Sequence, residues 1–154
     1  MAETDPTAEG TPMNSFRTVR RVEFGETDMA GIVHFSNFFR FMESAETAFL
    51  QSLGLSVTWL DGGVRYGFPR VSAACDYKHP ARFEDALAID VTVEKLGKKS
   101  VSYRFDFSVG ETAIAVGRIT SVYCRGTDHG GIESLELPPE IRAKLLPGGT
   151  TITT

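Results

Sequence analysis

The stretch RRVEFGETDMAGIVHFSNFFR, from Arg20 to Arg40, predicts the end of a strand, a tight turn and the start of a long helix. Its glycines, Gly25 and Gly31, permit backbone angles that other residues resist. Asp28 lies between them, just before the expected helix N-terminus. A carboxylate placed there can be held ionised and directed at a bound electrophile. We therefore treat the rest of the chain as the scaffold and binding surface for Asp28.

The expected helix carries one apolar face. Ser36 or Asn37 could cap its start, and Gly54 is a plausible stop because glycine readily takes the left-handed conformation that often ends a helix. The sequence predicts no second long helix, but Pro138 and Pro139 open a short one at 140–146. The apolar residues at helical spacing are Phe38, Phe41, Met42, Ala45, Ala48, Phe49 and Leu53.

Alternating apolar residues predict four strands, and a fifth stretch that is apolar on both faces predicts a central strand. Gly97 and Gly110 lie in short connections that are typical of hairpins, so the neighbouring strands should be antiparallel. Residues 55–69 are irregular and predict a loop or a short helix over the core. The expected strands span residues 16–24, 71–77, 87–93, 101–109 and 112–125.

This order of elements predicts an α+β fold in a single domain at residues 16–147, with flexible tails at 1–15 and 148–154. One helix cannot cover both faces of such a sheet, and a sheet leaves unpaired edges. We therefore expect the sheet to wrap around the helix and to pair with a second copy, which makes a homodimer the minimum assembly.

Composition and charge argue against several functions. A net charge of -4 disfavours general nucleic-acid binding, although it permits a local basic patch for a phosphorylated ligand. The sequence has neither a secretion signal nor an apolar run of ~18 residues, so we expect no membrane span and a cytoplasmic location. Cys75 and Cys124 could form a disulfide, but two buried free thiols fit a reducing cytoplasm better.

Carboxylates are the candidates for chemistry. The histidines lack metal-ligand spacing, the cysteines form no CxxC pair, and GxSxG, Walker and GxGxxG motifs are missing. Asp28 is the leading carboxylate, although Asp near Gly commonly just stabilises a turn. Glu43 and Glu46 are rivals on the helix, unless they belong to a solvated face. Amide groups at the helix N-terminus would suit a developing oxyanion, unless they are simply capped.

The stretch from Arg21 to Phe38 resembles the signature of the 4-hydroxybenzoyl-CoA thioesterase family of hotdog-fold enzymes. The resemblance continues through NFFRFME and through YKHPARFEDAL at residues 77–87, and it covers roughly residues 17–125. It implies a hotdog fold, in which a five-stranded antiparallel sheet wraps a long central helix. It also implies a dimer, often a dimer of dimers, and hence a homotetramer.

In similar enzymes the aspartate at the position of Asp28 is catalytic, and it either attacks the thioester carbonyl or activates a water. The backbone amide at the position of Phe35 donates to the carbonyl oxygen. The resemblance further implies substrate contacts at Gly31 and Glu43, and Trp59 could line the acyl pocket.

Two features of this chain depart from the family pattern or widen the choice. Many relatives carry a histidine at the position of Phe35, whereas His34 lies one residue earlier, so no catalytic role is transferred to it. Some hotdog thioesterases place the catalytic carboxylate on the long helix, which keeps Glu43 as a second candidate.

The expected function is a cytoplasmic thioesterase that hydrolyses an aromatic or short-to-medium-chain acyl-CoA to the free acid and CoA. A thioester is weakly stabilised by resonance and its thiolate leaves readily, so a carboxylate with an oxyanion donor can suffice. Coenzyme A enters as part of the substrate, and no further cofactor or metal is expected. Candidates to contact its phosphates are Arg70, Lys78, Lys98, Lys99 and Arg125.

Two alternatives belong to other classes. The first is a hotdog dehydratase or hydratase, which would pair a differently placed histidine with a helix carboxylate. The second is a non-catalytic acyl-CoA-binding hotdog protein, which would bind the ligand without turning it over.

Overall fold

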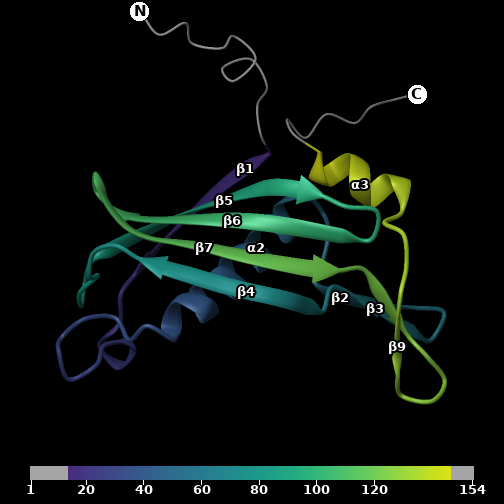
Figure 1. Cartoon of the computed structure of the whole chain (residues 1–154), viewed down its shortest axis with the longest axis horizontal. Coiled ribbons are helices and arrows are strands. Elements are labelled where there is room, and N and C mark those ends of the chain that lie inside the picture. The colour runs from purple at the N-terminus through teal and green to yellow at the C-terminus, as the bar shows by residue number, and fades with distance from the viewer. Residues whose placement is uncertain (1–13, 147–154) are drawn as a thin grey trace, which may run out of the picture.

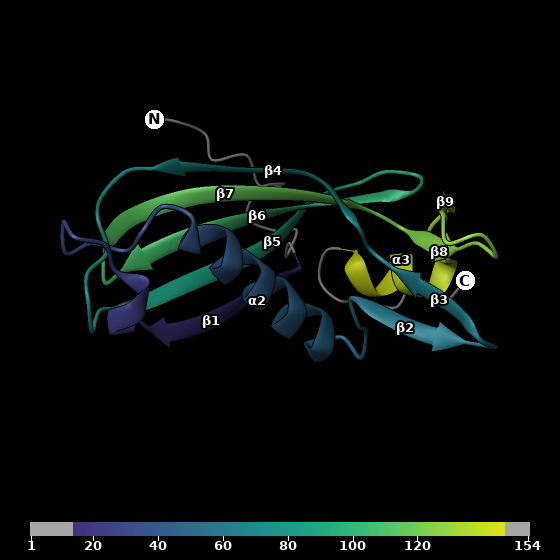
Figure 2. The same cartoon turned by 90° about the horizontal axis from the view of Figure 1, so that it is seen from below.

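A five-stranded antiparallel sheet packs one face against a long helix, α2 (Asn37–Ser52), in the computed structural model, which describes residues 14–146 (Figure 1). The strand order is β1-β5-β6-β7-β4. Seen from below, α2 runs along the inner face of this sheet (Figure 2). The strands are β1 (Ser15–Arg21), β4 (Arg70–Tyr77), β5 (Ala86–Leu96), β6 (Ser100–Val109) and β7 (Thr112–Val122).

The core lies between α2 and the sheet face that it covers. Alternate residues of the two central strands β5 and β6 are buried there, as their period-two pattern predicts. From the helix, Phe38, Phe41, Met42, Ala45 and Phe49 are buried, which confirms its predicted apolar face. Gly117 of β7 allows the close approach, because a Cβ at that position would lie 2.2 Å from the sulfur of Met42.

The predicted C-terminal stop of the helix is confirmed. Gly54 has a φ of +73°, and its amide donates to the carbonyl of Gln51 at 3.0 Å. The amide of Leu55 donates to the carbonyl of Leu50 at 2.8 Å, which completes a Schellman motif. At the other end Ser36 occupies the N-cap position, but its side chain makes no capping hydrogen bond.

The prediction of a loop or short helix at residues 55–69 is wrong. This region forms a hairpin of β2 (Thr58–Asp61) and β3 (Val64–Gly67). Gly62 and Gly63 both have positive φ, the geometry that a two-residue type I′ hairpin turn requires. The hairpin joins β8 (Cys124–Gly126) and β9 (Ile132–Ser134) in a second sheet of order β2-β3-β8-β9.

Two predicted strands were too long. The strand expected at 16–24 ends at Arg21, and a 3-10 turn (Phe24–Glu26) follows because Glu23 and Glu26 form a capping box. The strand expected at 112–125 divides at Tyr123, where the chain passes from the first sheet to the second. The short C-terminal helix is confirmed as α3 (Pro139–Leu145).

The edge strand β4 is largely exposed, with Val71 63% and Tyr77 46% accessible. Cys75 and Cys124 are free thiols, the first partly buried and the second buried. Within residues 14–146 no helix is long and apolar enough to cross a membrane. The predicted tails lie outside the described residues apart from Asn14 and Ser15, the latter being the first residue of β1.

Candidate active site

Asp28 lies in a tight turn that its own backbone closes. Its amide donates to the carbonyl of Ile32 at 2.8 Å, and its carbonyl accepts from the amide of Gly31 at 3.0 Å. Gly31 has a φ of +79°, which glycine tolerates best. The Asp28 Oδ1 accepts from the amide of Ala30 at 2.8 Å, so the turn-stabilising role is present. Among the described residues no hydrogen bond to Oδ2 is found, and this oxygen remains available to a ligand.

The amide of Phe35 is held in a fixed direction. The carbonyl of His34 belongs to the same planar peptide unit, and it accepts from the amide of Asn37 at 2.9 Å. The carbonyl of Phe35 accepts from the hydroxyl of Tyr77 at 2.9 Å. Within the part of the chain that the structure describes, the amide of Phe35 itself has no hydrogen-bond acceptor. Phe35 precedes the N-cap Ser36, so this donor lies just before the helix rather than in its first turn.

Asp28 and Phe35 line one cavity of about 500 Å³, which we call the Asp28 cavity. A segment following β4 contributes Lys78 and His79 to it. The His79 Nδ1 lies 2.9 Å from the carbonyl oxygen of Ala113, which anchors the ring. The remaining lining residues are mostly apolar: Ile32, Val33, Phe38, Tyr77, Pro80 and Ala81.

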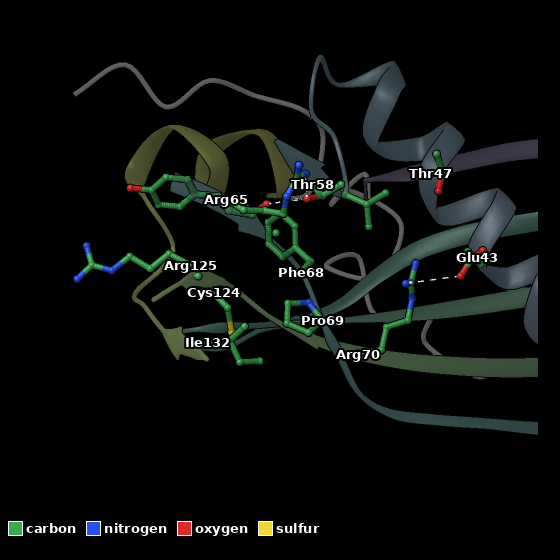
Figure 3. Close-up of a pocket in the computed structure, with 14 residues that line it drawn as sticks. Glu43, Thr47, Thr58, Arg65, Phe68, Pro69, Arg70, Cys124, Arg125 and Ile132 are labelled. Carbon is green, nitrogen blue, oxygen red and sulfur yellow. Dashed lines mark hydrogen bonds and ion pairs between the residues drawn. The ribbon is translucent and has the colours of Figure 1, made fainter. Parts of the chain in front are cut away.

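A second cavity, also of about 500 Å³, lies between α2 and the second sheet (Figure 3). We call it the Arg70 groove. Glu43 and Thr47 line it from the helix, while Arg65, Arg70 and Arg125 line it from the strands. Its apolar wall consists of Val57, Phe68, Pro69 and Ile132.

A β-bulge directs Arg70 toward the helix. Arg70 and Ser72 pair with the consecutive residues Ser121 and Thr120, so Val71 is an extra residue in β4. Simple alternation along residues 71–77 would place Val71 on one face with Ala73, Cys75 and Tyr77, and the bulge moves it off that face. Arg70 takes that place on the side facing α2, and Val71 is exposed.

Two helix carboxylates contact Arg70. Its Nη2 donates to Glu46 Oε1 at 3.1 Å, and its Nη1 lies 3.7 Å from Glu43 Oε2. Glu46 is fully buried, so it is no part of a solvated helix face, whereas the side chain of Glu43 is 63% exposed. Burial raises the pKa of Glu46 to about 7, against the opposing effect of the Arg70 charge.

The other predicted contacts are dispersed. Gly31 shapes the Asp28 turn and does not line either cavity. Trp59 stacks on Tyr66 and Tyr123 and packs against the core rather than lining the Arg70 groove. Lys98 pairs with Glu136 at 3.5 Å, and Lys99 donates to Ser134 at 3.4 Å, both outside the two cavities. Arg125 lines the groove, but it pairs with Glu133 at 3.1 Å.

The contacts of two residues, Tyr77 and Glu46, are evident only from the structure. Tyr77 was predicted to lie in a strand, and its contact with Phe35 spans 42 positions, a separation that periodicity does not reveal. Glu46 was a rival carboxylate, but its contact with Arg70 depends on the bulge that orients that arginine. Among residues 14–146 no cluster of three or more His, Cys, Asp or Glu side chains could hold a metal ion.

Comparison with known proteins identifies the family. A model of the thioesterase-like superfamily matches residues 22–145. A 1,4-dihydroxy-2-naphthoyl-CoA hydrolase of Prochlorococcus marinus is 31% identical over 111 residues, covering 68% of this chain and 74% of the relative. The 4-hydroxybenzoyl-CoA thioesterase of Pseudomonas sp. is 32% identical over 92 residues, covering 58% of this chain and 64% of the relative.

A solved structure agrees with this assignment. That of a gentisyl-coenzyme A thioesterase matches with a TM-score of 0.71 and 28% sequence identity, covering 84% of this chain and 99% of the other. The resemblance to the 4-hydroxybenzoyl-CoA thioesterase family is thus confirmed. This chain belongs to the thioesterase-like superfamily of hotdog-fold thioester hydrolases.

Proposed function

We propose that this protein hydrolyses an aromatic acyl-CoA, with Asp28 as nucleophile or general base and the Phe35 amide as oxyanion donor. The observation that carries the proposal is that a carboxylate with a free oxygen and an unpaired, fixed amide line the same largely apolar cavity. One donor of this kind typically contributes about 3–4 kcal/mol to the transition state.

Asp28 can act by either of two reaction routes. As a nucleophile, the carboxylate attacks the thioester carbonyl, expels the CoA thiolate and forms a mixed anhydride that water then hydrolyses. As a general base, it takes a proton from the water that attacks the carbonyl directly. In both routes the carbonyl oxygen becomes negative while the Phe35 amide faces it. Both use only the protein, water and the substrate, so the proposed reaction needs no metal or resident cofactor.

An aromatic acyl group is supported by the relatives and by the lining of the cavities. The named relatives act on 1,4-dihydroxy-2-naphthoyl-CoA and 4-hydroxybenzoyl-CoA. Both cavities have apolar walls that an aromatic ring could contact. A short-to-medium aliphatic chain is the alternative, since apolar walls accept both.

We further propose that two copies pair through β4. This edge strand is eight residues long and presents exposed apolar side chains, a combination that favours pairing with another strand. A two-fold axis makes the copies antiparallel, so the Tyr77 end of one β4 lies beside the Arg70 end of the other. The Asp28 cavity of one copy then adjoins the Arg70 groove of its partner. A dimer of dimers would be built from such pairs.

Of the cations expected to contact CoA phosphates, Lys78 and Arg125 remain the best supported, because each lines one of the two cavities and is exposed. Arg70 also lines a cavity, but its guanidinium is held by the buried Glu46. Lys98 and Lys99 lie outside both. The free thiols Cys75 and Cys124 support the proposed location in a reducing cytoplasm.

Thiol release from a panel of acyl-CoAs tests the proposal. The panel contains benzoyl-, 4-hydroxybenzoyl-, 1,4-dihydroxy-2-naphthoyl-, butyryl- and octanoyl-CoA, and the enzymes are wild type, Asp28→Asn and Glu43→Gln. We expect the wild type to prefer aromatic thioesters and Asp28→Asn to lose turnover. Absence of wild-type turnover on every thioester would leave an acyl-CoA-binding protein. Full activity of Asp28→Asn, with loss in Glu43→Gln, would move the chemistry to the helix.

A further inference from the structure

The helix-facing core of this protein contains a carboxylate that packing alone does not explain. Glu46 has no exposed surface, and its Oε2 has no hydrogen-bond partner among the described residues. Burying a half-satisfied carboxylate costs several kcal/mol, and an apolar residue at that position would avoid the cost. Ser121 lies opposite Arg70 in the pairing of β7 with β4. Its hydroxyl is also buried without a hydrogen-bond partner among the described residues. A polar cluster is therefore maintained at this position despite its cost.

The contacts of Glu46 hold Arg70 in place. The hydrogen bond from Arg70 to Glu46 anchors one end of the guanidinium inside the core. The separation of 3.7 Å from Glu43 is too long for a hydrogen bond and leaves both groups able to bind another partner (Figure 3). The Arg70 side chain is 30% exposed and lines the groove. A fixed donor thus stands beside an accessible acceptor on the groove wall.

This arrangement suits a hydroxyl group on an aromatic ring. A hydroxyl can accept from Arg70 and donate to Glu43 at the same time. The adjoining wall of Val57, Phe68 and Pro69 can contact the apolar ring. A free carboxylate on the ring would suit the site less well, because Glu43 and Glu46 would repel it.

We propose that Arg70 is a specificity-determining residue that recognises a hydroxyl on the aromatic acyl group, and that Glu46 is the positioning residue that holds it. This inference rests on the proposed function, in which the groove of one copy adjoins the Asp28 cavity of its partner. It assigns Arg70 to the acyl group rather than to the phosphates of CoA, where sequence alone had placed it.

The other two arginines of the groove serve as controls. Arg125 pairs with exposed Glu133, and Figure 3 shows its side chain extending away from Arg70 and Glu43. Arg65 donates to the hydroxyl of Thr58 at 3.2 Å and is exposed. Neither contacts a buried carboxylate, so neither is held as Arg70 is. Arg125→Met removes the same charge from the same groove without touching the proposed contact.

The test measures binding of non-hydrolysable thioether analogues of benzoyl-CoA and of its 2-, 3- and 4-hydroxy derivatives by titration calorimetry. The quantity of interest is the ratio of the Kd of the benzoyl analogue to that of the hydroxylated analogue that binds most tightly. We expect a ratio of at least about tenfold for the wild type, because a site built around a hydroxyl penalises its absence.

Arg70→Met should reduce this ratio to near one while changing the Kd of the benzoyl analogue less than about threefold. Glu46→Gln should lower the ratio by about threefold, and Arg125→Met should leave it unchanged. If Glu46 had only a structural role, Glu46→Gln would instead raise the Kd of the benzoyl analogue and that of the hydroxylated analogue by the same factor. If Arg70→Met fails to fold, Arg70→Met/Glu46→Met removes both charges and carries the same expectation.

A wild-type ratio near one, an unchanged ratio in the Arg70 variant, or an equal fall of the ratio in the Arg70 and Arg125 variants would overturn the inference. The analogues bind without turnover, so this result is separate from thiol release. Selective binding without any hydrolysis would remove the proposed function alone. Hydrolysis with no dependence of selectivity on Arg70 would remove the inference alone.

Discussion

The Asp28 cavity and the Arg70 groove have similar volumes but are built in opposite ways. In the first, backbone groups of one short segment, together with the Tyr77 hydroxyl, hold an accessible carboxylate and a free amide. In the second, a buried carboxylate holds a guanidinium that comes from a different part of the chain. The first site should therefore tolerate neutral substitutions with little loss of stability. The second depends on a balance of buried charge, and should respond to pH and to the loss of either partner.

The largest expected difference is the pH dependence that Glu46 imposes on folding. Its pKa is about 7 in the folded protein against an ordinary value of 4.5, so the folded state retains a proton that the unfolded state releases. The stability that this retained proton contributes is fully present below about pH 4.5 and is lost as the pH rises through about 7. Urea unfolding should show the wild type losing on the order of 3 kcal/mol relative to Glu46→Gln between pH 5 and 8. Glu43→Gln, which keeps Glu46, should retain this pH dependence. Parallel curves of unfolding free energy against pH for wild type and Glu46→Gln would contradict the assignment of the dependence to Glu46.

The next-largest expected effect is the loss of stability when Glu46 loses its partner cation, Arg70. Arg70→Met leaves Glu46 without its counter-charge, and we expect the free energy of unfolding at pH 8 to fall by about 2 kcal/mol. This figure is below that for a fully buried pair because Arg70 is partly exposed. Arg70→Met/Glu46→Met should recover most of the loss. In contrast, Asp28→Asn can still accept from the Ala30 amide and should cost under about 0.5 kcal/mol. Equal costs for Arg70→Met and Asp28→Asn would remove the distinction between the two regions.

The smallest effect tests whether the Phe35 segment must be held in place. Desolvation raises the pKa of Tyr77 to about 12, so its hydroxyl stays protonated and donates to the Phe35 carbonyl at neutral pH. Removing this bond in Tyr77→Phe should cost about 1 kcal/mol in the transition state, or roughly fivefold in kcat, without changing analogue binding. Tyr66→Phe in the Arg70 groove is the control and should leave kcat within about twofold. An unchanged kcat in Tyr77→Phe would show that Phe35 needs no such support.

The same contrast explains what could be predicted from the sequence. The turn, the helix face and the glycine stop at Gly54 depend on neighbours within a few residues, and each was readable from local pattern. The arrangement around Arg70 was not, because an extra residue at Val71 reverses the face on which the preceding side chain lies. The hairpin at β2 and β3 was missed because its two glycines resembled an irregular loop. The contact of Tyr77 with Phe35 joins residues 42 positions apart, so local pattern could not reveal it.

The most direct test of the central claim separates chemistry from binding at Asp28. Single-turnover hydrolysis of 4-hydroxybenzoyl-CoA and the Kd of its thioether analogue are measured for wild type and Asp28→Asn. We predict that the rate constant falls by at least about 100-fold, whichever of the two roles Asp28 plays, while the Kd changes less than about threefold. A rate constant for Asp28→Asn within threefold of wild type, at unchanged affinity, would contradict the assignment of Asp28 as the catalytic carboxylate.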